Sequence, residues 1–239
     1  MSGDFLFKYR GQVPIFLFFI VIPFIYYTDY NDFSDKLLKE NMIISFLISF
    51  IGIFIRVYTV GTTPAGTSGR NRKKQIAKKL NQTGLYSIVR HPLYLGNFLI
   101  WLGISMYTLN TTFTIFLSLF FFSYYNIIMK TEEKFLEKKF KNEFLLWKKY
   151  TPMLFPSLNN YCKSKYTFSI KTVLKREYSS FLATIFSFFY IQTLINYFNE
   201  ENIIISNNMW SILLFSIIIT LILRVIKKNT SMLSERGRT

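Results

Sequence analysis

Two short polar segments carry residues that could bind a charged small molecule. The first contains the run Arg90-His91-Pro92-Leu93-Tyr94. Proline suits the first turn of a helix and pushes the residue before it out of the helical conformation. Arg90 and His91 are therefore expected on a non-helical shoulder beside a helix N-terminus, with Tyr94 just inside the helix. Such a cationic N-terminus can bind a carboxylate or a phosphate. The alternative is a helix cap, with Arg90 reaching the lipid headgroups.

The second segment is the acidic pair Glu132-Glu133, which follows an apolar stretch. Alone, the pair would be a solvated helix start with lysine partners. The short link around Asn110 makes residues 93–129 a helical hairpin, however. The rise is roughly 29 Å from His91 to Asn110 and roughly 33 Å from there to Glu132, at about 1.5 Å per residue. The two polar segments are therefore expected at one membrane depth, where cations and carboxylates together complement an amino-acid headgroup.

Six apolar segments must position these residues. Hydrophobic residues make up 51% of the 239 positions and charged residues only 18%, gathered in blocks. Most of the apolar segments approach the ~20 residues that a helix needs to cross the hydrocarbon layer. The sequence therefore predicts an all-α, polytopic membrane protein with about six transmembrane helices, at residues 13–27, 42–60, 93–109, 113–129, 181–198 and 209–226.

The basic residues predict how these helices are oriented. Loops rich in lysine and arginine alternate with loops that are acidic or uncharged, and basic loops stay in the cytoplasm. Both termini are therefore expected in the cytoplasm, within a bacterial inner membrane or the endoplasmic reticulum. The net charge of +16 could indicate nucleic acid, but in a membrane chain it reflects cytoplasmic loops and anionic lipids. We expect no nucleic-acid partner.

The chain divides into two predicted parts. Residues 1–160 hold four spans and an amphipathic helix after the acidic pair, which could lie at the membrane interface or close over a pocket. Residues 161–239 hold a basic interfacial segment and a C-terminal transmembrane hairpin. A single cysteine, Cys162, and a single histidine, His91, exclude an internal disulfide and argue against a metal centre.

The ordered motifs resemble the superfamily of isoprenylcysteine carboxyl methyltransferases and phospholipid methyltransferases. The resemblance covers roughly residues 78–156. It rests on Gly84-Leu85-Tyr86, the run from Arg90 to Gly96, Glu132-Glu133, the aromatic run from Phe140 to Trp147, and Pro152 with Pro156. It implies an S-adenosylmethionine-dependent methyltransferase that acts at the cytoplasmic face on a membrane lipid or lipid-attached group. The acceptor could be a carboxylate, a phosphate or an amine.

The resemblance also implies roles for individual residues. Residues 78–81 occupy a stretch that contacts the cofactor in relatives, although the residue types differ. Glu133 and Arg90 are the candidate catalytic residues. An amine acceptor must lose a proton, which Glu133 or a tyrosine could accept, whereas an anionic acceptor needs no base. The residues implied to bind the cofactor are Tyr86, His91, Pro92, Leu93, Tyr94 and Glu132.

The sequence departs from the family pattern at one position, and two alternative functions stay open. Prenyl-cysteine enzymes have an arginine four residues before the cofactor-binding glutamate, and here that position is Ile128. This difference disfavours a prenyl-cysteine carboxylate as the acceptor. Membrane sterol or isoprenoid reductases carry a similar Arg-His-Pro-x-Tyr run and use NADPH. A non-enzymatic membrane scaffold is the other alternative.

Overall fold

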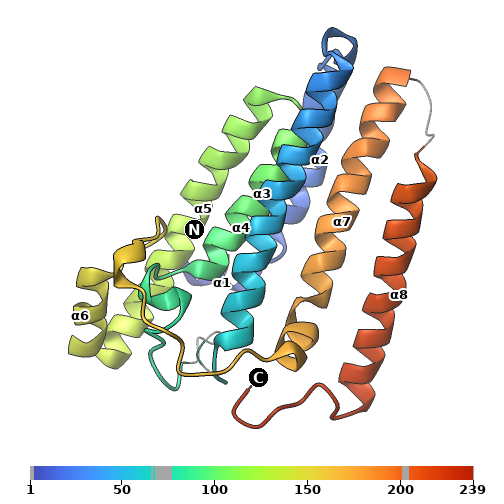
Figure 1. The fold of residues 1–239 in the computed structure, drawn as a ribbon. Coiled ribbons are helices and arrows are strands. Elements are labelled where there is room, and N and C mark those ends of the chain that lie inside the picture. The colour runs from blue at the N-terminus through green and yellow to red at the C-terminus, as the bar shows by residue number, and fades with distance from the viewer. Residues whose placement is uncertain (1–2, 66, 68–76, 201–204, 239) are drawn as a thin grey trace.

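The computed structural model describes residues 3–65, 67, 77–200 and 205–238, and these form a bundle of helices (Figure 1). One isolated β-bridge, between Gly84 and Cys162, accompanies them. The all-α prediction is confirmed. The α-helices are α1 (Gly3–Tyr9), α2 (Leu17–Tyr26), α3 (Asp35–Thr62), α4 (Pro92–Tyr107), α5 (Thr111–Phe140), α6 (Asn142–Tyr150), α7 (Ile170–Glu200) and α8 (Asn207–Asn229), and short 3-10 helices are η1 (Val13–Phe16), η2 (Tyr30–Asp32), η3 (Leu85–Ser87) and η4 (Leu158–Asn160).

Local sequence signals fix where the long helices begin. The side chain of Ser34 accepts a hydrogen bond from the backbone of Leu37 at the start of α3, and Asn110 accepts one from Phe113 at the start of α5. Both satisfy backbone N–H groups that have no partner within the helix. Pro92 occupies the first turn of α4, as predicted. The short link before Asn110 thus produces the expected hairpin of α4 and α5.

Among the described residues, four helices are long and apolar enough to cross a membrane: α3, α5, α7 and α8. They correspond to four of the six predicted spans. The other two predicted spans are shorter helices. The apolar helix of residues 13–26 includes η1 and α2, and α4 has 16 residues. Both are shorter than the ~20 residues of a typical span, so the six-span arrangement stays a prediction.

The helices run alternately up and down, and their connections gather at two ends of the bundle (Figure 1). One end holds the turns before α3 and α5. The opposite end holds residues 63–65, 77–91, 151–169 and 230–238. This separation agrees with the alternation of basic and non-basic loops, although which end faces the cytoplasm stays a prediction. Arg70, Arg72, Lys73 and Lys74 of the second basic loop lie outside the described residues.

Helices α3 and α4 pack with their backbones almost in contact. A Cβ atom added to Gly52 would lie 2.5 Å from the carbonyl oxygen of Gly96, and one added to Gly103 would lie 2.3 Å from that of Ser45. Real Cβ atoms do not approach so closely, so these positions require glycine. The close packing holds the two helices in a fixed relation and thereby positions the polar residues that follow Gly52 and Gly96.

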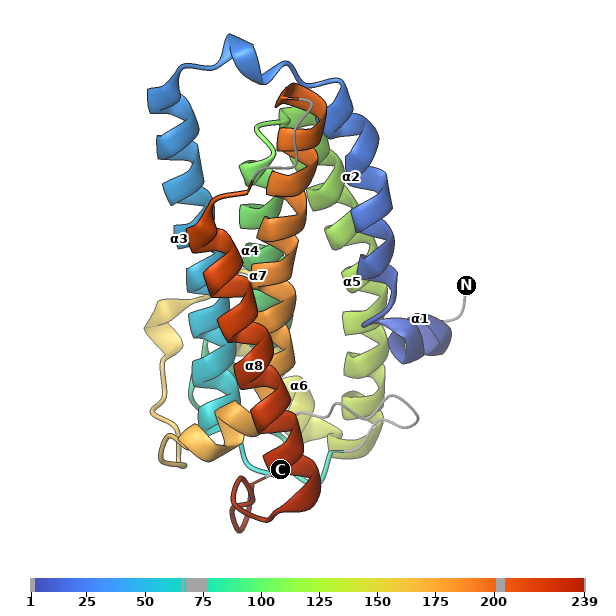
Figure 2. The ribbon, with the colours of Figure 1, turned by 90° about the vertical axis from the view of Figure 1, so that its right-hand side faces the viewer.

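The other helices surround this pair. Helix α7 packs against α2, α3 and α4. Helix α8 packs against α7, at the edge of the bundle in Figure 1 and in front of α7 in Figure 2. Helix α1 lies across the flank of α5. There its buried Leu6 and Phe7 pack into an apolar cluster with Tyr94, Tyr125 and Ile128. The N-terminal residues therefore form part of the wall around the predicted site.

Candidate functional site

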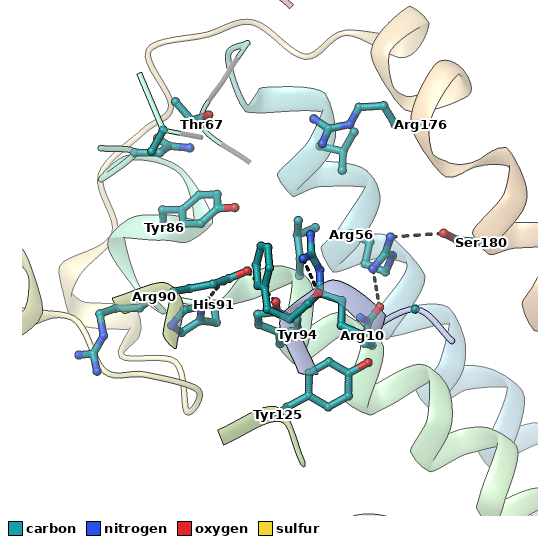
Figure 3. A pocket seen from close by; sticks show the side chains of 18 of the residues that line it. Arg10, Arg56, Thr67, Tyr86, Arg90, His91, Tyr94, Tyr125, Arg176 and Ser180 are labelled. Carbon is teal, nitrogen blue, oxygen red and sulfur yellow. Dashed lines mark hydrogen bonds and ion pairs between the residues drawn. The ribbon is translucent and has the colours of Figure 1, made fainter. Parts of the chain in front are cut away.

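A cavity of about 700 Å³ opens where α3, α4, α5 and α7 come together, with α1 and α6 at its margins (Figure 3). Its volume lies within the ~300–1,000 Å³ typical of pockets for small ligands. Its lining combines tyrosines with arginines and two carboxylates. Of the residues implied to bind the cofactor, Tyr86, His91, Leu93, Tyr94 and Glu132 line it. Pro92 is buried beside them at the start of α4.

The shoulder before α4 is held by the proline-containing segment after α6. The backbone N–H of Arg90 donates to the carbonyl of Pro152 at 2.8 Å, and that of His91 donates to the carbonyl of Met153 at 3.2 Å. His91 has φ −124° and ψ 62°. It is non-helical, as predicted, but it is not fully extended. These bonds fix the imidazole at the cavity instead of leaving it on a mobile loop.

The two polar segments converge as the rise along the hairpin predicted. The Tyr94 hydroxyl donates to Glu132 Oε1 at 2.8 Å. His91 lies between both carboxylates, with Nδ1 3.6 Å from Glu132 Oε2 and Nε2 3.1 Å from Glu133 Oε1. The prediction that the shoulder and the acidic pair share one depth is therefore confirmed.

The two carboxylates of the pair have different surroundings. The Glu132 side chain lines the cavity and is 26% exposed, whereas that of Glu133 is 5% exposed and does not line it. Glu133 accepts from Arg90 Nε at 2.8 Å and lies 3.6 Å from Lys148 Nζ. One carboxylate therefore faces a ligand-sized space, and the other is surrounded by protein cations.

Arg90 is fixed on its other side as well. Its Nη1 donates to the backbone carbonyls of Lys148 and Thr151, at the end of α6. The side chain borders the cavity but is only 8% exposed. The ion pair of Arg90 and Glu133 thus joins α5 to the start of α4 and the end of α6. The catalytic roles expected of Arg90 and Glu133 stay a prediction, and this geometry also suits groups that position the shoulder.

Helix α6 brings aromatic residues to the cavity. The predicted amphipathic helix after the acidic pair is broken at Lys141, which has φ +46°, and α6 continues in a new direction. Such a positive φ is unusual for a residue other than glycine. The break lets Phe144 become fully buried and places Trp147 in the lining. The Trp147 indole donates to the carbonyl of Tyr86 at 2.9 Å. Trp147 and Tyr86 therefore form one wall of the cavity together.

A second polar cluster lies on the α7 side of the cavity, and the sequence analysis did not predict it. Arg56 of α3 donates through Nε and Nη2 to the two oxygens of Glu177, at 2.9 and 3.0 Å. It also donates to Asn97 of α4 and to Ser180 of α7 (Figure 3). In the sequence, the pair Arg176-Glu177 lies just before the predicted apolar segment at residues 181–198, and Ser180 follows Glu177 by one helical turn. These polar residues at the start of a span were the signal that could have indicated the cluster.

Two further regions contribute cations to the lining. Arg10, just after α1, stacks on Phe7 with its guanidinium carbon 3.9 Å from the ring centre. Lys79 belongs to residues 78–81, and Leu80 and Asn81 also line the cavity. This stretch therefore borders the same cavity, and its contact with a cofactor stays a prediction. Within the described part of the chain, no cluster of three or more histidine, cysteine, aspartate or glutamate residues could hold a metal ion.

The fold and cavity agree with a family assignment for the central part of the chain. Residues 41–143 match the model of the phospholipid methyltransferase family. For this segment, the match confirms the resemblance to the superfamily of integral membrane methyltransferases. The matched segment runs from the start of the apolar part of α3 to the first turn of α6. It contains the shoulder, the α4–α5 hairpin and both carboxylates, and it excludes α7 and α8.

Individual relatives match over a shorter stretch. The chain is 39% identical over 79 residues to the cobalt-zinc-cadmium resistance protein CzcN of Cupriavidus metallidurans, which is 33% of this chain and 36% of that protein. It is 36% identical over 81 residues to the nickel-cobalt-cadmium resistance protein NccN of Alcaligenes xylosoxydans xylosoxydans, 34% of this chain and 38% of the relative. The similarity thus spans little more than a third of either relative. No solved structure matches the chain.

Proposed function

We propose that this protein is an S-adenosylmethionine-dependent methyltransferase that acts on a membrane lipid or a lipid-attached group at the cytoplasmic face. The observation that carries the proposal is the position of Glu132. Within the segment that matches the family, the α4–α5 hairpin presents this carboxylate to a cavity of ligand size, beside Tyr94 and His91. A partly exposed carboxylate in such a place can bind a cationic ligand group.

The lining fits the chemical groups of the methyl donor. Glu132 can accept hydrogen bonds from its ammonium or its ribose, and His91 lies where it can hold Glu132 or the donor itself. Tyr86 and Trp147 offer aromatic faces. Such faces suit an adenine ring and attract a cation such as a sulfonium. The lining also holds arginines that can bind the donor's carboxylate.

The protein's contribution to the reaction is then mainly positioning. The donor supplies an electrophilic methyl group on its sulfonium. The chain must hold the acceptor atom in line with that methyl and keep water away. Such positioning of the reactants can account for a large part of the rate acceleration in a displacement reaction. The shoulder, fixed by its bonds to Pro152 and Met153, and the buried pair of Arg90 and Glu133 provide a rigid frame for this alignment.

A lipid acceptor fits the surroundings of the cavity. The helices α3 and α7, which border it, are among those long and apolar enough to cross a membrane. Large apolar side chains such as Phe50 and Phe54 of α3 are exposed on the surface of the protein. Exposed apolar surfaces on long apolar helices are expected to face lipid. The apolar part of an acceptor can therefore remain in the bilayer while the donor enters from the aqueous side.

Binding of the demethylated donor tests the proposal. Calorimetry on detergent-purified protein is expected to show binding of S-adenosylhomocysteine and none of NADPH, which a reductase would bind. His91→Ala is expected to weaken the former, while Lys138→Ala, an exposed change on α5, leaves it unchanged. Binding of NADPH alone, or a lower stability of His91→Ala with unchanged affinity for S-adenosylhomocysteine, would contradict the assignment.

A further inference from the structure

The cavity lining has an excess of positive charge among the described residues. Two carboxylates, Glu132 and Glu177, face five basic side chains: Arg10, Arg56, Lys79, Arg90 and Arg176. Glu133 pairs with Arg90 from outside the lining and reduces the excess, but it leaves the lining positive. A lining of one sign raises the local concentration of ligands with the opposite sign.

The methyl donor does not account for this excess. Its carboxylate is offset by its ammonium, and its sulfonium adds a further positive charge. When the donor is bound, the cavity therefore becomes more positive. A second ligand that carries negative charge would be stabilised by the same lining, and in a methyltransferase this second ligand is the acceptor.

Two of the five basic side chains reach the cavity from the region of α1 and from α7. Arg176, in the first turns of α7, is only 7% exposed and yet lines the cavity. Figure 3 shows its side chain extending from α7 toward the side where Tyr86 lies. Arg10 reaches the cavity from the segment after α1, stacked on Phe7. A planar guanidinium with several N–H donors is well suited to a phosphate or a carboxylate.

A second pocket lies along α3 and α7, closer to the end of the bundle that holds the turns before α3 and α5. It has a volume of about 390 Å³ and is lined by α3, α7 and α8. Its lining begins at Ile53, one turn before Arg56, and at Thr184, one turn after Ser180. It reaches Phe46 and Phe188, at helical spacing on the same faces. The lining is almost wholly apolar, so a hydrocarbon chain suits it.

We propose that the α1 and α7 side of the cavity binds the anionic headgroup of the acceptor, a phosphate or carboxylate on a lipid. Arg10 and Arg176 bind the oxygens, and the apolar pocket between α3 and α7 holds part of the hydrocarbon chain. The methyl-transfer step rests on the proposed function, whereas the binding of the anionic lipid does not.

The transfer that follows from this site needs no general base. An oxygen of the anionic group gives an electron pair to the methyl carbon, and the carbon–sulfur electrons return to the sulfonium of the donor. The products are a methyl ester and a neutral thioether, and no proton moves. This balance agrees with the position of Glu133, which is buried with Arg90 and is not in the lining.

Three single-chain probes test the binding site on protein purified in a neutral maltoside detergent. Dodecyl phosphate and dodecanoate carry a net negative charge, and dodecylphosphocholine has the same chain with no net charge. Calorimetry without donor is expected to show that one or both anions bind the wild-type protein at least roughly tenfold more tightly than the phosphocholine. Preference for dodecyl phosphate identifies a lipid phosphate as the acceptor, and preference for dodecanoate a lipid carboxylate.

A matched pair of variants locates the site. Arg176→Gln is expected to weaken binding of the anionic probe roughly tenfold or more, and to change the affinity for S-adenosylhomocysteine less than about twofold. Lys171→Gln removes an exposed cation from the same helix and is expected to change neither. Equal loss in both variants, or no loss in Arg176→Gln, overturns the site.

The wild-type protein keeps the proposal testable if Arg176→Gln does not fold. Equal binding of dodecylphosphocholine and the anions to wild type would overturn the anionic headgroup without any variant. The two proposals also fail separately. Binding of S-adenosylhomocysteine without selective binding of the anions overturns the acceptor site alone. Binding of the anions without S-adenosylhomocysteine overturns the methyltransferase and leaves the anion site standing.

Discussion

Replacement of Glu132 by glutamine is the sharpest test of the proposed binding of the methyl donor in the cavity. Glutamine keeps the shape and one carbonyl oxygen, so the Tyr94 hydroxyl, now 2.8 Å from Glu132 Oε1, retains an acceptor. The charge is lost, and one acceptor becomes a donor. The free energy of unfolding is therefore expected to change by less than about 1 kcal/mol, whereas binding of the donor's ammonium or ribose loses a charged hydrogen bond.

The size of that loss follows from the exposure of the side chain. A hydrogen bond to a charged group contributes about 1.5–3 kcal/mol. Because the Glu132 side chain is 26% exposed, solvent screens part of its field. The lower part of the range, about 1.5–2 kcal/mol, is therefore expected. It corresponds to a roughly 10- to 30-fold higher Kd for S-adenosylhomocysteine.

Calorimetry on detergent-purified wild type and Glu132→Gln measures this change directly, with thermal unfolding of both proteins as the check on folding. Glu137→Gln is the matched control. Glu137 lies farther along α5 with its side chain 46% exposed and 3.7 Å from Lys148. It is expected to tolerate the change, with an effect within ~0.5 kcal/mol. Equal affinity in the two variants would refute the assignment of Glu132 to the donor and remove the main support for the proposed reaction.

Three further experiments test the buried ion pair of Arg90 and Glu133, the close contact of α3 with α4, and the predicted orientation in the membrane. Glu133→Ala leaves a buried guanidinium unpaired and is expected to cost about 3–5 kcal/mol of stability by thermal or chemical unfolding, in contrast to Glu132→Gln. Gly52→Ala forces a Cβ against the α4 backbone and is expected to cost about 1–3 kcal/mol in the same assay. In a Cys162→Ser background, Thr111→Cys is expected to react with an impermeant thiol reagent from outside the cell, and Asn159→Cys is not. The reverse labelling would place the cavity on the wrong side of the membrane for a cytoplasmic donor.

The part of the site formed by neighbouring spans could be predicted from the sequence. Pro92 identifies the start of α4, and the short link before Asn110 requires α4 and α5 to form a hairpin. Because the rise per residue of a helix is fixed, α5 returns Glu132 to the depth of His91. These signals are local, or they depend on one short connection. The contacts of Tyr94 and His91 with the acidic pair confirm them.

The roles within the acidic pair could not be separated in the same way. Glu132 and Glu133 are adjacent, and which of them faces the cavity depends on the rotation of α5 about its axis. That rotation is set by packing of buried residues such as Tyr125 and Ile128 against α1 and α4. Their partners are far away in the sequence, and no pattern within α5 specifies them.

The α7 side of the cavity was missed because hydropathy marks only the apolar part of a helix. The predicted span begins at residue 181, but α7 begins at Ile170. Its first turns are polar and carry Arg176 and Glu177 to the cavity. The pairing of Glu177 with Arg56 joins residues that are 121 positions apart. No spacing rule connects two helices at that distance.

This long separation has a consequence for how the protein is made. At a synthesis rate of ~5–20 residues per second, Arg56 leaves the ribosome roughly 6–24 seconds before Glu177, 121 positions later. Before that interval ends, α3 and α4 are complete, but the guanidinium still lacks the carboxylate that it pairs with in the folded structure. A nascent chain that stops before α7 therefore displays an uncompensated cation at an open groove. Arrival of α7 neutralises this charge and encloses the cavity, so the pairing of Arg56 with Glu177 marks the docking of this helix.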